Sequence, residues 1–153
     1  MHKFKNHIFL PVFIYLSAYC GIAAGNSIIE QSNNYHFESF LDSITSFPYY
    51  APLKQQENLK INYLKLKVGM TKGEVLNILP SPNAEFFSYI EKGKEKIFKK
   101  SSLAYYLSRK EHRFASDDDA VLFLHFNELE QLYWSIPNNI EGLSSLGNPA
   151  GAR

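Results

Sequence analysis

Residues 66–82 read LKVGMTKGEVLNILPSP and contain the strongest local structural signals in the chain. Thr71 and Glu74 stand at the T-x-x-E spacing of a capping box. In this motif the threonine hydroxyl accepts a hydrogen bond from the first turn of a helix, and the glutamate carboxylate accepts one from the cap residue's own N–H. The spacing therefore predicts a helix that begins at Thr71.

The residues on either side of this cap predict how the chain enters and leaves the helix. Gly69 follows a short apolar run and can adopt a turn conformation that is closed to most residues. Pro80 and Pro82 end the helix, because proline lacks the N–H and pushes the preceding residue out of the α region. One apolar stripe results from the i, i+3, i+4 spacing of Val75, Ile78 and Leu79.

This segment resembles the V-x-x-G-M-T-x-x-E-V-x-x-x-L-G-x-P signature of the SmpA/OmlA domain, the BamE-like family of small envelope lipoproteins. Pro80 stands where that family usually has glycine, so the turn that leaves the helix is expected to differ. The matching residues are Gly69, Met70, Thr71, Glu74, Val75, Leu79 and Pro82.

The remaining chain has one further clear helical pattern, a polar stretch over residues 55–65 that fits a short helix followed by an extended segment, and several β-type stretches. Apolar residues recur with helical spacing over residues 35–45, which predicts either a helix that packs on the core or one that binds a partner's groove. Residues 103–107, 120–126 and 132–136 have the composition and length of strands. The middle one alternates Val121, Phe123 and His125 with Leu122, Leu124 and Phe126, so both of its faces are apolar.

These elements extend the resemblance, because the BamE-like domain packs two N-terminal helices on one face of a three-stranded antiparallel sheet. The stretch 120–136, with Asn127 opening the turn, is similar to the strand pair of that family. We therefore expect an α+β fold, with two N-terminal helices on a three-stranded antiparallel β-meander over residues 26–136. The tail 137–153 is rich in Asn, Gly, Ser and Pro, and is expected to be flexible.

Residues 1–25 have the pattern of an export signal. Lys3 and Lys5 precede an apolar run over residues 8–19, and small residues follow. That run is shorter than the roughly 20 residues that a transmembrane helix needs. Two kinds of processing remain open: ordinary cleavage near residue 25, or acylation of Cys20, the only cysteine. Both place the protein in the periplasm or on the periplasmic face of the outer membrane.

Composition and motif spacing argue against several function classes. Without residues 1–25 the chain has 14 basic and 15 acidic side chains, which is not typical of a nucleic-acid-binding protein. We find no spacing typical of a catalytic motif, a metal site or a cofactor, and expect a protein that is not an enzyme. The run 117–119 is expected to be a solvated acidic turn, and His125 a core or edge residue. The lysine-rich stretch 92–100 is expected to be a solvated loop, with an anionic lipid or acidic partner surface as the alternative.

The aromatic content of the strands predicts a docking surface. Adjacent residues in a strand point to opposite faces, so helices on one face cannot cover all the aromatic rings. The candidate partner surface consists of Tyr105, Tyr106, Tyr133 and Trp134. In the alternative, residues 47–52 or 84–90 fold over that face.

The expected function is that of a protein-binding module of the bacterial envelope. The resemblance implies an accessory role in outer-membrane protein assembly or envelope integrity, with an envelope protein as partner and association with the membrane. The alternative is an inhibitor-type module of the β-lactamase-inhibitor-like kind, which has a similar helix-and-sheet arrangement and acts on a soluble enzyme.

Overall fold

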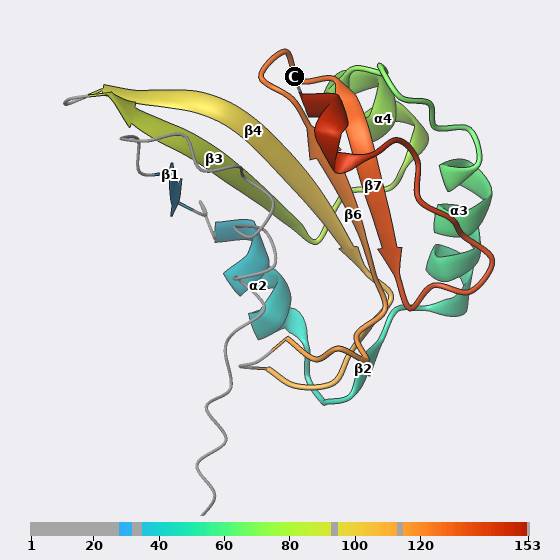
Figure 1. Ribbon diagram of the computed structural model, residues 1–153. Helices are drawn as coiled ribbons and strands as arrows, with labels where there is room; N and C mark the ends of the chain where they lie inside the picture. Colours follow the sequence, from blue (N-terminus) through green and yellow to red (C-terminus); the bar gives the residue numbers. More distant parts are fainter. Residues whose placement is uncertain (1–27, 32–34, 93–94, 113–114, 153) are drawn as a thin grey trace, which may run out of the picture.

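The computed structural model describes residues 28–31, 35–92, 95–112 and 115–152 and has an α+β fold (Figure 1). The predicted export signal, including Cys20, lies outside the described residues. The elements in chain order are β1 (Ile28–Gln31), α2 (Tyr35–Ser43), β2 (Tyr49–Tyr50), α3 (Leu53–Tyr63), α4 (Lys72–Ile78), β3 (Ala84–Lys92), β4 (Glu95–Tyr106), β5 (Ser108–Arg109), β6 (Val121–Phe126), β7 (Leu132–Asn138) and the 3-10 helix η1 (Pro149–Ala152).

The main sheet is antiparallel and has the strand order β1-β3-β4-β6-β7. The three strands expected from the sequence correspond to the end of β4, to β6 and to β7, and they are neighbours in this order. The α+β class is therefore confirmed, but the sheet is larger than the expected three-stranded meander because β1 and β3 extend it. A separate small sheet pairs β2 with β5.

Most of the lysine-rich stretch belongs to the sheet, because β3 extends to Lys92 and β4 begins at Glu95, and the expectation of a solvated loop is wrong for these strand residues. In the register Glu91 lies opposite Lys96 and Lys92 lies opposite Glu95. Opposite charges at directly facing positions of an antiparallel pair stabilise the pairing. A run of lysines is typical of a solvated loop. The glutamates between these lysines form cross-strand pairs with them and thus favour a hairpin.

The helices lie on both faces of the sheet, so the expected arrangement of two N-terminal helices on one face of a three-stranded sheet is not confirmed in its detail. Figure 1 shows α3 and α4 beside β6 and β7, and α2 on the other side of the sheet. Leu59 of α3 and Val75 of α4 belong to the larger core cluster, together with Leu122 and Leu124 of β6. The helix expected over residues 35–45 is α2, and it contributes to a second, smaller cluster.

The larger core has the alternation predicted for the middle strand. Leu122, Leu124 and Phe126 share the face that packs on α3 and α4, and all three are fully buried. Full burial of a large apolar side chain stabilises a fold by about 1.5–3 kcal/mol. This strand is therefore a principal source of the domain's stability.

The smaller core includes a group of stacked aromatic rings under α2, next to the buried side chains of Ala84, Ala104 and Val121. Phe37 and Phe40 stack on Tyr106 of β4, with ring centroids 5.8 and 5.5 Å apart, respectively. Tyr49 meets Phe40 edge-on at 5.4 Å. Residues 47–52 thus add one ring to this cover, as one of the sequence alternatives proposed, but α2 provides most of it.

The segment after β7 packs on the domain, which differs from the flexible tail expected from residue 137. Ile140 is buried in the larger core, and Leu143 and Leu146 pack against it. The N–H of Ser135 donates to the carbonyl of Leu146 over 2.9 Å, so the segment also pairs with the outer edge of β7. An uncovered edge strand exposes main-chain N–H and C=O groups that can pair with a strand of another molecule, and the C-terminal segment prevents this along part of β7.

Candidate functional site

The capping box of residues 71–74 is formed as predicted. The N–H of Glu74 donates to the Thr71 hydroxyl oxygen at 3.3 Å, and Glu74 Oε2 accepts from the N–H of Thr71 at 2.8 Å. The hydrogen bond from the Thr71 backbone, and then that from its side chain, lower the pKa of the Glu74 carboxyl. Gly69 has a φ of +91°, which is the conformation that favours glycine.

The other motif residues have structural roles. Val75 and Leu79 are buried in the larger core, and Met70 packs against it from the loop. Pro82 follows the helix and is half-buried. The cap residue Leu79 is extended, so the helix ends directly before Pro80 without the glycine turn of the resembled family.

The motif segment also pairs with β7, which the sequence did not predict. The N–H of Gly69 donates to the carbonyl of Leu132 at 2.8 Å, and the N–H of Leu132 donates to the carbonyl of Met70 at 2.8 Å. These bonds connect the loop before α4 to the first residue of β7. In the β6–β7 turn Asn127 Oδ1 accepts from the N–H groups of Leu129 and Gln131, as expected of a turn-opening asparagine.

The predicted partner surface is largely buried. Tyr105 faces the helical layer and is 2% exposed, while Tyr106 lies under α2 and is 5% exposed. Tyr133 is 7% exposed, and Trp134 is half-buried. The prediction that these rings form an exposed docking face is therefore wrong for the three tyrosines, because α2 supplies a cover on the second face of the sheet and a β-bulge redirects Tyr133.

The bulge in β7 brings Tyr133 and Trp134 to one histidine. Phe126 is opposite Leu132 and His125 is opposite Trp134, so Tyr133 is the extra residue. The ring of His125 lies 5.0 Å from that of Trp134 and 6.3 Å from that of Tyr133. The sequence prediction assumed strict alternation, which places the adjacent residues Tyr133 and Trp134 on opposite faces. Alternation does not hold across a bulge, so that prediction failed here.

His125 forms a buried polar pair with Ser102 on β4. Its Nδ1 is 2.8 Å from the Ser102 hydroxyl, and burial, followed by the charge of Lys100, lowers the pKa of the imidazole to about 4. The ring is therefore neutral near pH 7. Its Nε2 has no hydrogen-bond partner among the described residues. A serine–histidine pair in a hydrolytic enzyme requires a third group that orients the base, and the described contacts of His125 include no carboxylate.

Lys72 joins the start of α4 to the sheet and to the β6–β7 turn. Its ammonium forms ion pairs with Glu85 and with Glu130, and it lies 5.4 Å from the ring centroid of Phe87. Burial opposes the charged form of Lys72, but the carboxylates of Glu85 and then Glu130 outweigh it, and the pKa of Lys72 is raised. Burial, followed by the charge of Glu85, raises the pKa of Tyr105 well above its ordinary value.

A buried pair of opposite charges lies just beyond the end of β4, on β5 and in the loop before β6. Arg109 and Asp119 are both 2% exposed, and Arg109 Nη1 is 3.7 Å from Asp119 Oδ2. The guanidinium also lies 5.3 Å from the rings of Phe37 and Tyr106. The Asp119 carboxylate accepts from the N–H groups of Lys110 and Ser116. Of the predicted acidic turn, only Asp117 and Asp118 are solvated; Asp119 organises the loop, and no sequence pattern distinguished it from its neighbours.

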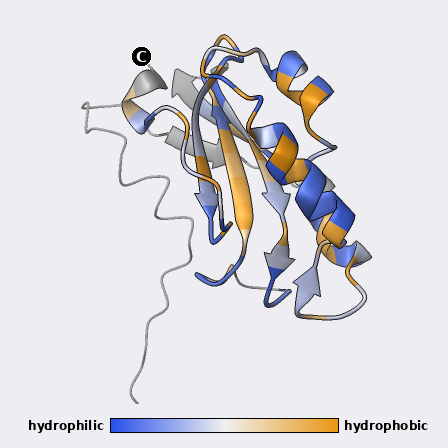
Figure 2. Ribbon diagram, turned by 90° about the vertical axis from the view of Figure 1, so that its right-hand side faces the viewer, coloured by the Kyte–Doolittle hydropathy of each residue, from blue (hydrophilic) through white to orange (hydrophobic). Residues whose placement is uncertain are grey.

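Most of the large apolar side chains that are exposed in the described part of the chain lie on or beside α3 and α4. Figure 2 looks at this helical layer, where apolar positions interrupt the polar surface of α3 and α4. Leu53, Ile61 and Leu64 are 76%, 60% and 75% exposed, respectively. Leu53 and Ile61 lie on α3 and Leu64 is its C-cap, while Val68 and Leu76 add exposed apolar surface on the loop and on α4. We call the set Leu53, Ile61, Leu64, Val68 and Leu76 the helical apolar surface.

The described ranges contain neither a group of side chains suited to hold a metal ion nor a helix of the length and apolar character needed to cross a membrane. Comparison of the chain with family models, curated proteins and solved structures gives no match.

Proposed function

We propose that this protein is an exported, non-enzymatic protein-binding module of the bacterial envelope. Three features support the proposal: the export pattern of residues 1–25, the resemblance of residues 66–82 to the BamE-like signature, and the helical apolar surface. By that resemblance, its role is accessory to outer-membrane protein assembly or envelope integrity. Its proposed location is the periplasm or the periplasmic face of the outer membrane.

The helical apolar surface is the observation that carries the protein-binding part. Leu53, Ile61 and Leu64 stand at i, i+8 and i+11, which places them along one side of α3. The side chain of Ile61 is 60% exposed, so replacing it with a polar residue would not disturb the packing of the core. Exposed apolar side chains gathered on one surface are typical of interaction sites. The proposed contact surface is thus the outer side of α3, instead of the aromatic sheet face expected from the sequence.

The second candidate is an inhibitor-type module that binds a soluble enzyme. The order of two helices, α3 and α4, followed by antiparallel strands is compatible with it as well as with a BamE-like domain. The two candidates differ in the partner: an assembly factor binds proteins of the outer membrane, whereas an inhibitor binds an enzyme in the soluble fraction.

Affinity capture from fractionated native envelopes tests the proposal. The double variant Ile61→Asp/Leu64→Asp should lose the membrane proteins that the wild-type chain retains, because charged side chains cannot be desolvated in an apolar contact. The matched control is Leu129→Asp, since Leu129 is 71% exposed but lies in the β6–β7 turn. Equal capture by the wild type, the double variant and the control would exclude the helical apolar surface as the contact.

The export part is tested separately by mass spectrometry of the protein from its native cells. We expect an N-terminus at Gly25 or Asn26, or an acylated Cys20. Recovery of the chain with Met1 intact in the cytosol would overturn the proposed location.

A further inference from the structure

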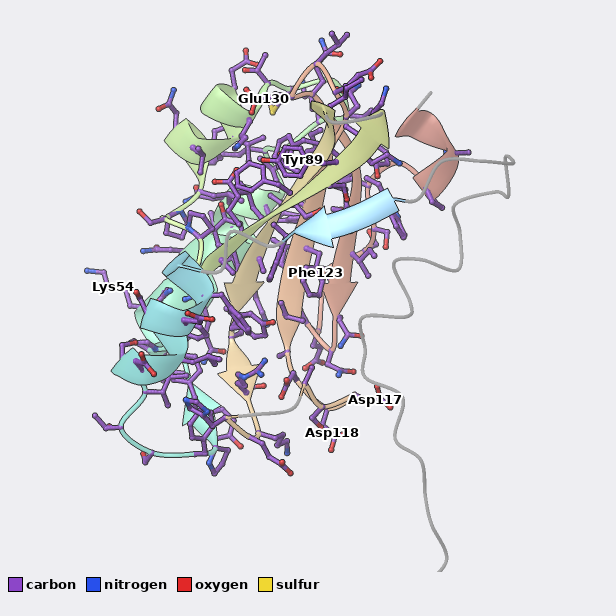
Figure 3. All side chains as sticks on the ribbon, turned by 90° about the vertical axis from the view of Figure 1, so that its left-hand side faces the viewer. Lys54, Tyr89, Asp117, Asp118, Phe123 and Glu130 are labelled. Carbon is purple, nitrogen blue, oxygen red and sulfur yellow. The ribbon has the colours of Figure 1, made fainter. Side chains whose placement is uncertain are left out.

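The helical apolar surface is bordered by positive charge. Residues 53–68 contain four lysines and one glutamate. Lys54, Lys65 and Lys67 are exposed, and Lys60 is half-buried. In Figure 3 the side chain of Lys54 projects beyond the ribbon of the domain. None of the four lysines forms an ion pair with a residue that the structure describes. Their charge is therefore available to a partner.

The lysines of α3 lie on both sides of its apolar stripe, which consists of Leu53, Ile61 and Leu64. A helical rotation of about 100° per residue places Lys54 just beyond Ile61 on one side of the stripe. On the other side Lys60 lies just beyond Leu53. In Figure 2 hydrophilic positions accordingly border the apolar ones along α3. A partner that covers the stripe therefore meets a lysine at each flank.

The one carboxylate of this surface lies within the apolar stripe. Glu57 is exposed and stands four residues after Leu53 and four before Ile61, so it projects from the same side of α3. It forms no ion pair with any described residue. Covering a carboxylate without a counter-charge is strongly unfavourable. A partner that fits the stripe therefore carries a cation opposite Glu57.

This arrangement of charges favours a protein partner over a lipid bilayer or a second copy of the chain. The phosphate groups of an anionic bilayer would attract the lysines but repel the central Glu57. In a twofold-symmetric dimer the same positively charged surface would stand on both sides of the contact. Like charges brought together across an interface suppress association.

The shape of the surface favours a helix as the contacting segment. The main chain of α3 is hydrogen-bonded internally, so a partner strand would find no main-chain groups with which to pair. Leu53 and Leu64 are eleven residues apart, which corresponds to about 16 Å or three turns along the axis. Side chains at i, i+4 and i+7 of a second helix form a ridge that packs against a stripe of this kind.

We propose that the partner segment is an amphipathic helix with acidic side chains on both flanks of its apolar stripe and one basic side chain within it. The acidic flanks pair with the lysines of α3 and the basic side chain pairs with Glu57. This inference rests on the proposed protein-binding function and assigns the chemistry of the partner.

Two synthetic peptides test the proposed charges with the full-length chain. Both have the same leucine stripe over about four helical turns. The acidic peptide has glutamates on the flanks and one arginine within the stripe, and the basic peptide has lysines and one glutamate at those positions. The wild type should bind the acidic peptide at least about tenfold more tightly, and high salt should reduce this difference. Equal binding, which includes no binding of either peptide, or tighter binding of the basic peptide would overturn the proposal.

Variants of the stripe and its flanks locate the contact. Ile61→Asp/Leu64→Asp should abolish binding of the acidic peptide. Lys54→Gln/Lys60→Gln should weaken it by about two- to thirtyfold, as expected for two exposed ion pairs. Lys54→Arg/Lys60→Arg keeps both charges and should restore the wild-type affinity, which a loss of folding would not allow. Unchanged binding by the aspartate variant would mean that the peptide binds elsewhere, and would overturn the proposal.

Two further variants separate the position of the charge from its amount. Lys99→Gln/Lys110→Gln removes the same charge from β4 and from the residue after β5, and should bind the acidic peptide as the wild type does. Glu57→Gln should lose the preference for the peptide with arginine over one with leucine at the same position. A loss by the Lys99 and Lys110 variant equal to that of the α3 variant, or an arginine preference that survives Glu57→Gln, would contradict the proposed pairing.

Photo-crosslinking in native envelopes tests the same chemistry on the natural partner. A photoreactive amino acid in place of Ile61 should attach to segments with more Asp and Glu than Lys and Arg, and one in place of Leu129 should not. Crosslinks from position 61 to basic segments, to lipid alone or to a second copy of the chain would overturn the proposal.

The capture experiment on native envelopes distinguishes this inference from the proposed function. If Ile61→Asp/Leu64→Asp loses the captured membrane proteins while Lys54→Gln/Lys60→Gln retains them at wild-type affinity, the proposed protein binding stands and the acidic partner is wrong. Full retention by both variants would overturn both. Loss in the first variant and weakening in the second would support both.

Discussion

The hydroxyl of Tyr63 on α3 lies 2.7 Å from the hydroxyl of Ser135 on β7, across 72 residues of sequence. Tyr63 donates its proton to the carbonyl of Ser144 at 2.6 Å, so in the Ser135 contact it is the acceptor. Ser135 Oγ in turn accepts from the N–H of Leu146 at 2.9 Å. A single chain of hydrogen bonds thereby connects the helical layer, the edge strand and the C-terminal segment.

Replacing Tyr63 with phenylalanine should interrupt this chain without changing the packing of the ring. The Ser144 carbonyl and the Ser135 hydroxyl then lose their partner, which should lower the free energy of unfolding by about 1–3 kcal/mol. Urea denaturation measures this change, and limited proteolysis should show faster cleavage after residue 140. Tyr50→Phe is the control, since Tyr50 is 61% exposed. If both variants unfold at the same urea concentration, the hydrogen-bond chain is not formed in solution.

Thr71→Ala should destabilise the domain by about 1 kcal/mol, because the N–H of Glu74 loses its acceptor. Thr71→Ser keeps the hydroxyl and should stay close to the wild type. Val75→Asp should cost more than Thr71→Ala, since Val75 is 0% exposed and the charge would be buried against the sheet. Chemical denaturation of the three variants checks this order. Unchanged midpoints for Thr71→Ala and Val75→Asp would mean that α4 is not formed or not packed.

Stability should decrease between pH 6.5 and about 4 because of His125. Its folded-state pKa of about 4 lies below the ordinary value of 6.5. Between these values the unfolded chain binds a proton that the folded chain does not, so lowering the pH favours unfolding. Each unit of difference corresponds to about 1.4 kcal/mol, and the total is of order 2–4 kcal/mol. Below about pH 4 both states are protonated and this effect no longer changes.

The variant His125→Gln should remove most of that dependence, whereas His112→Gln should retain it, because His112 is exposed. Among the described residues, the side chains near His125 are Ser102, Lys100 and the rings of Phe123, Tyr133 and Trp134, and none of them carries a carboxylate. Thermal unfolding at a series of pH values measures the slope. An identical slope in the wild type and His125→Gln would assign the effect to carboxylates instead.

Asp119→Ala should be strongly destabilising, by about 3–5 kcal/mol, because it leaves the buried Arg109 guanidinium without a counter-charge. The N–H groups of Lys110 and Ser116 lose their acceptor in the same variant. Asp118→Ala is the matched control from the adjacent, exposed position and should change stability by less than about 0.5 kcal/mol. Denaturation curves of the two variants would coincide only if the carboxylate of Asp119 were solvated.

The sequence alone determined the elements whose signals are local. The T-x-x-E spacing and the following prolines predicted α4 to within a residue or two, because a helix cap is formed by side chains three positions apart. The alternation in residues 120–126 predicted both faces of β6, because a buried strand has apolar residues on each side. Gly69 was identified as a turn residue for a similar reason, since its positive φ is a property of one residue.

The tertiary structure decided the features that depend on distant residues and leave no local signal in the sequence. The C-terminal segment has the composition of a flexible tail, but Tyr63 and Ser135 provide the hydrogen bonds that hold it. The side of the sheet that α2 covers, the bulge at Tyr133 and the burial of Asp119 depend on contacts with other strands and loops. The spacing of apolar residues shows which side of an element is apolar but not which other element covers it, so the exposed apolar side chains on α3 could be located only in the folded domain.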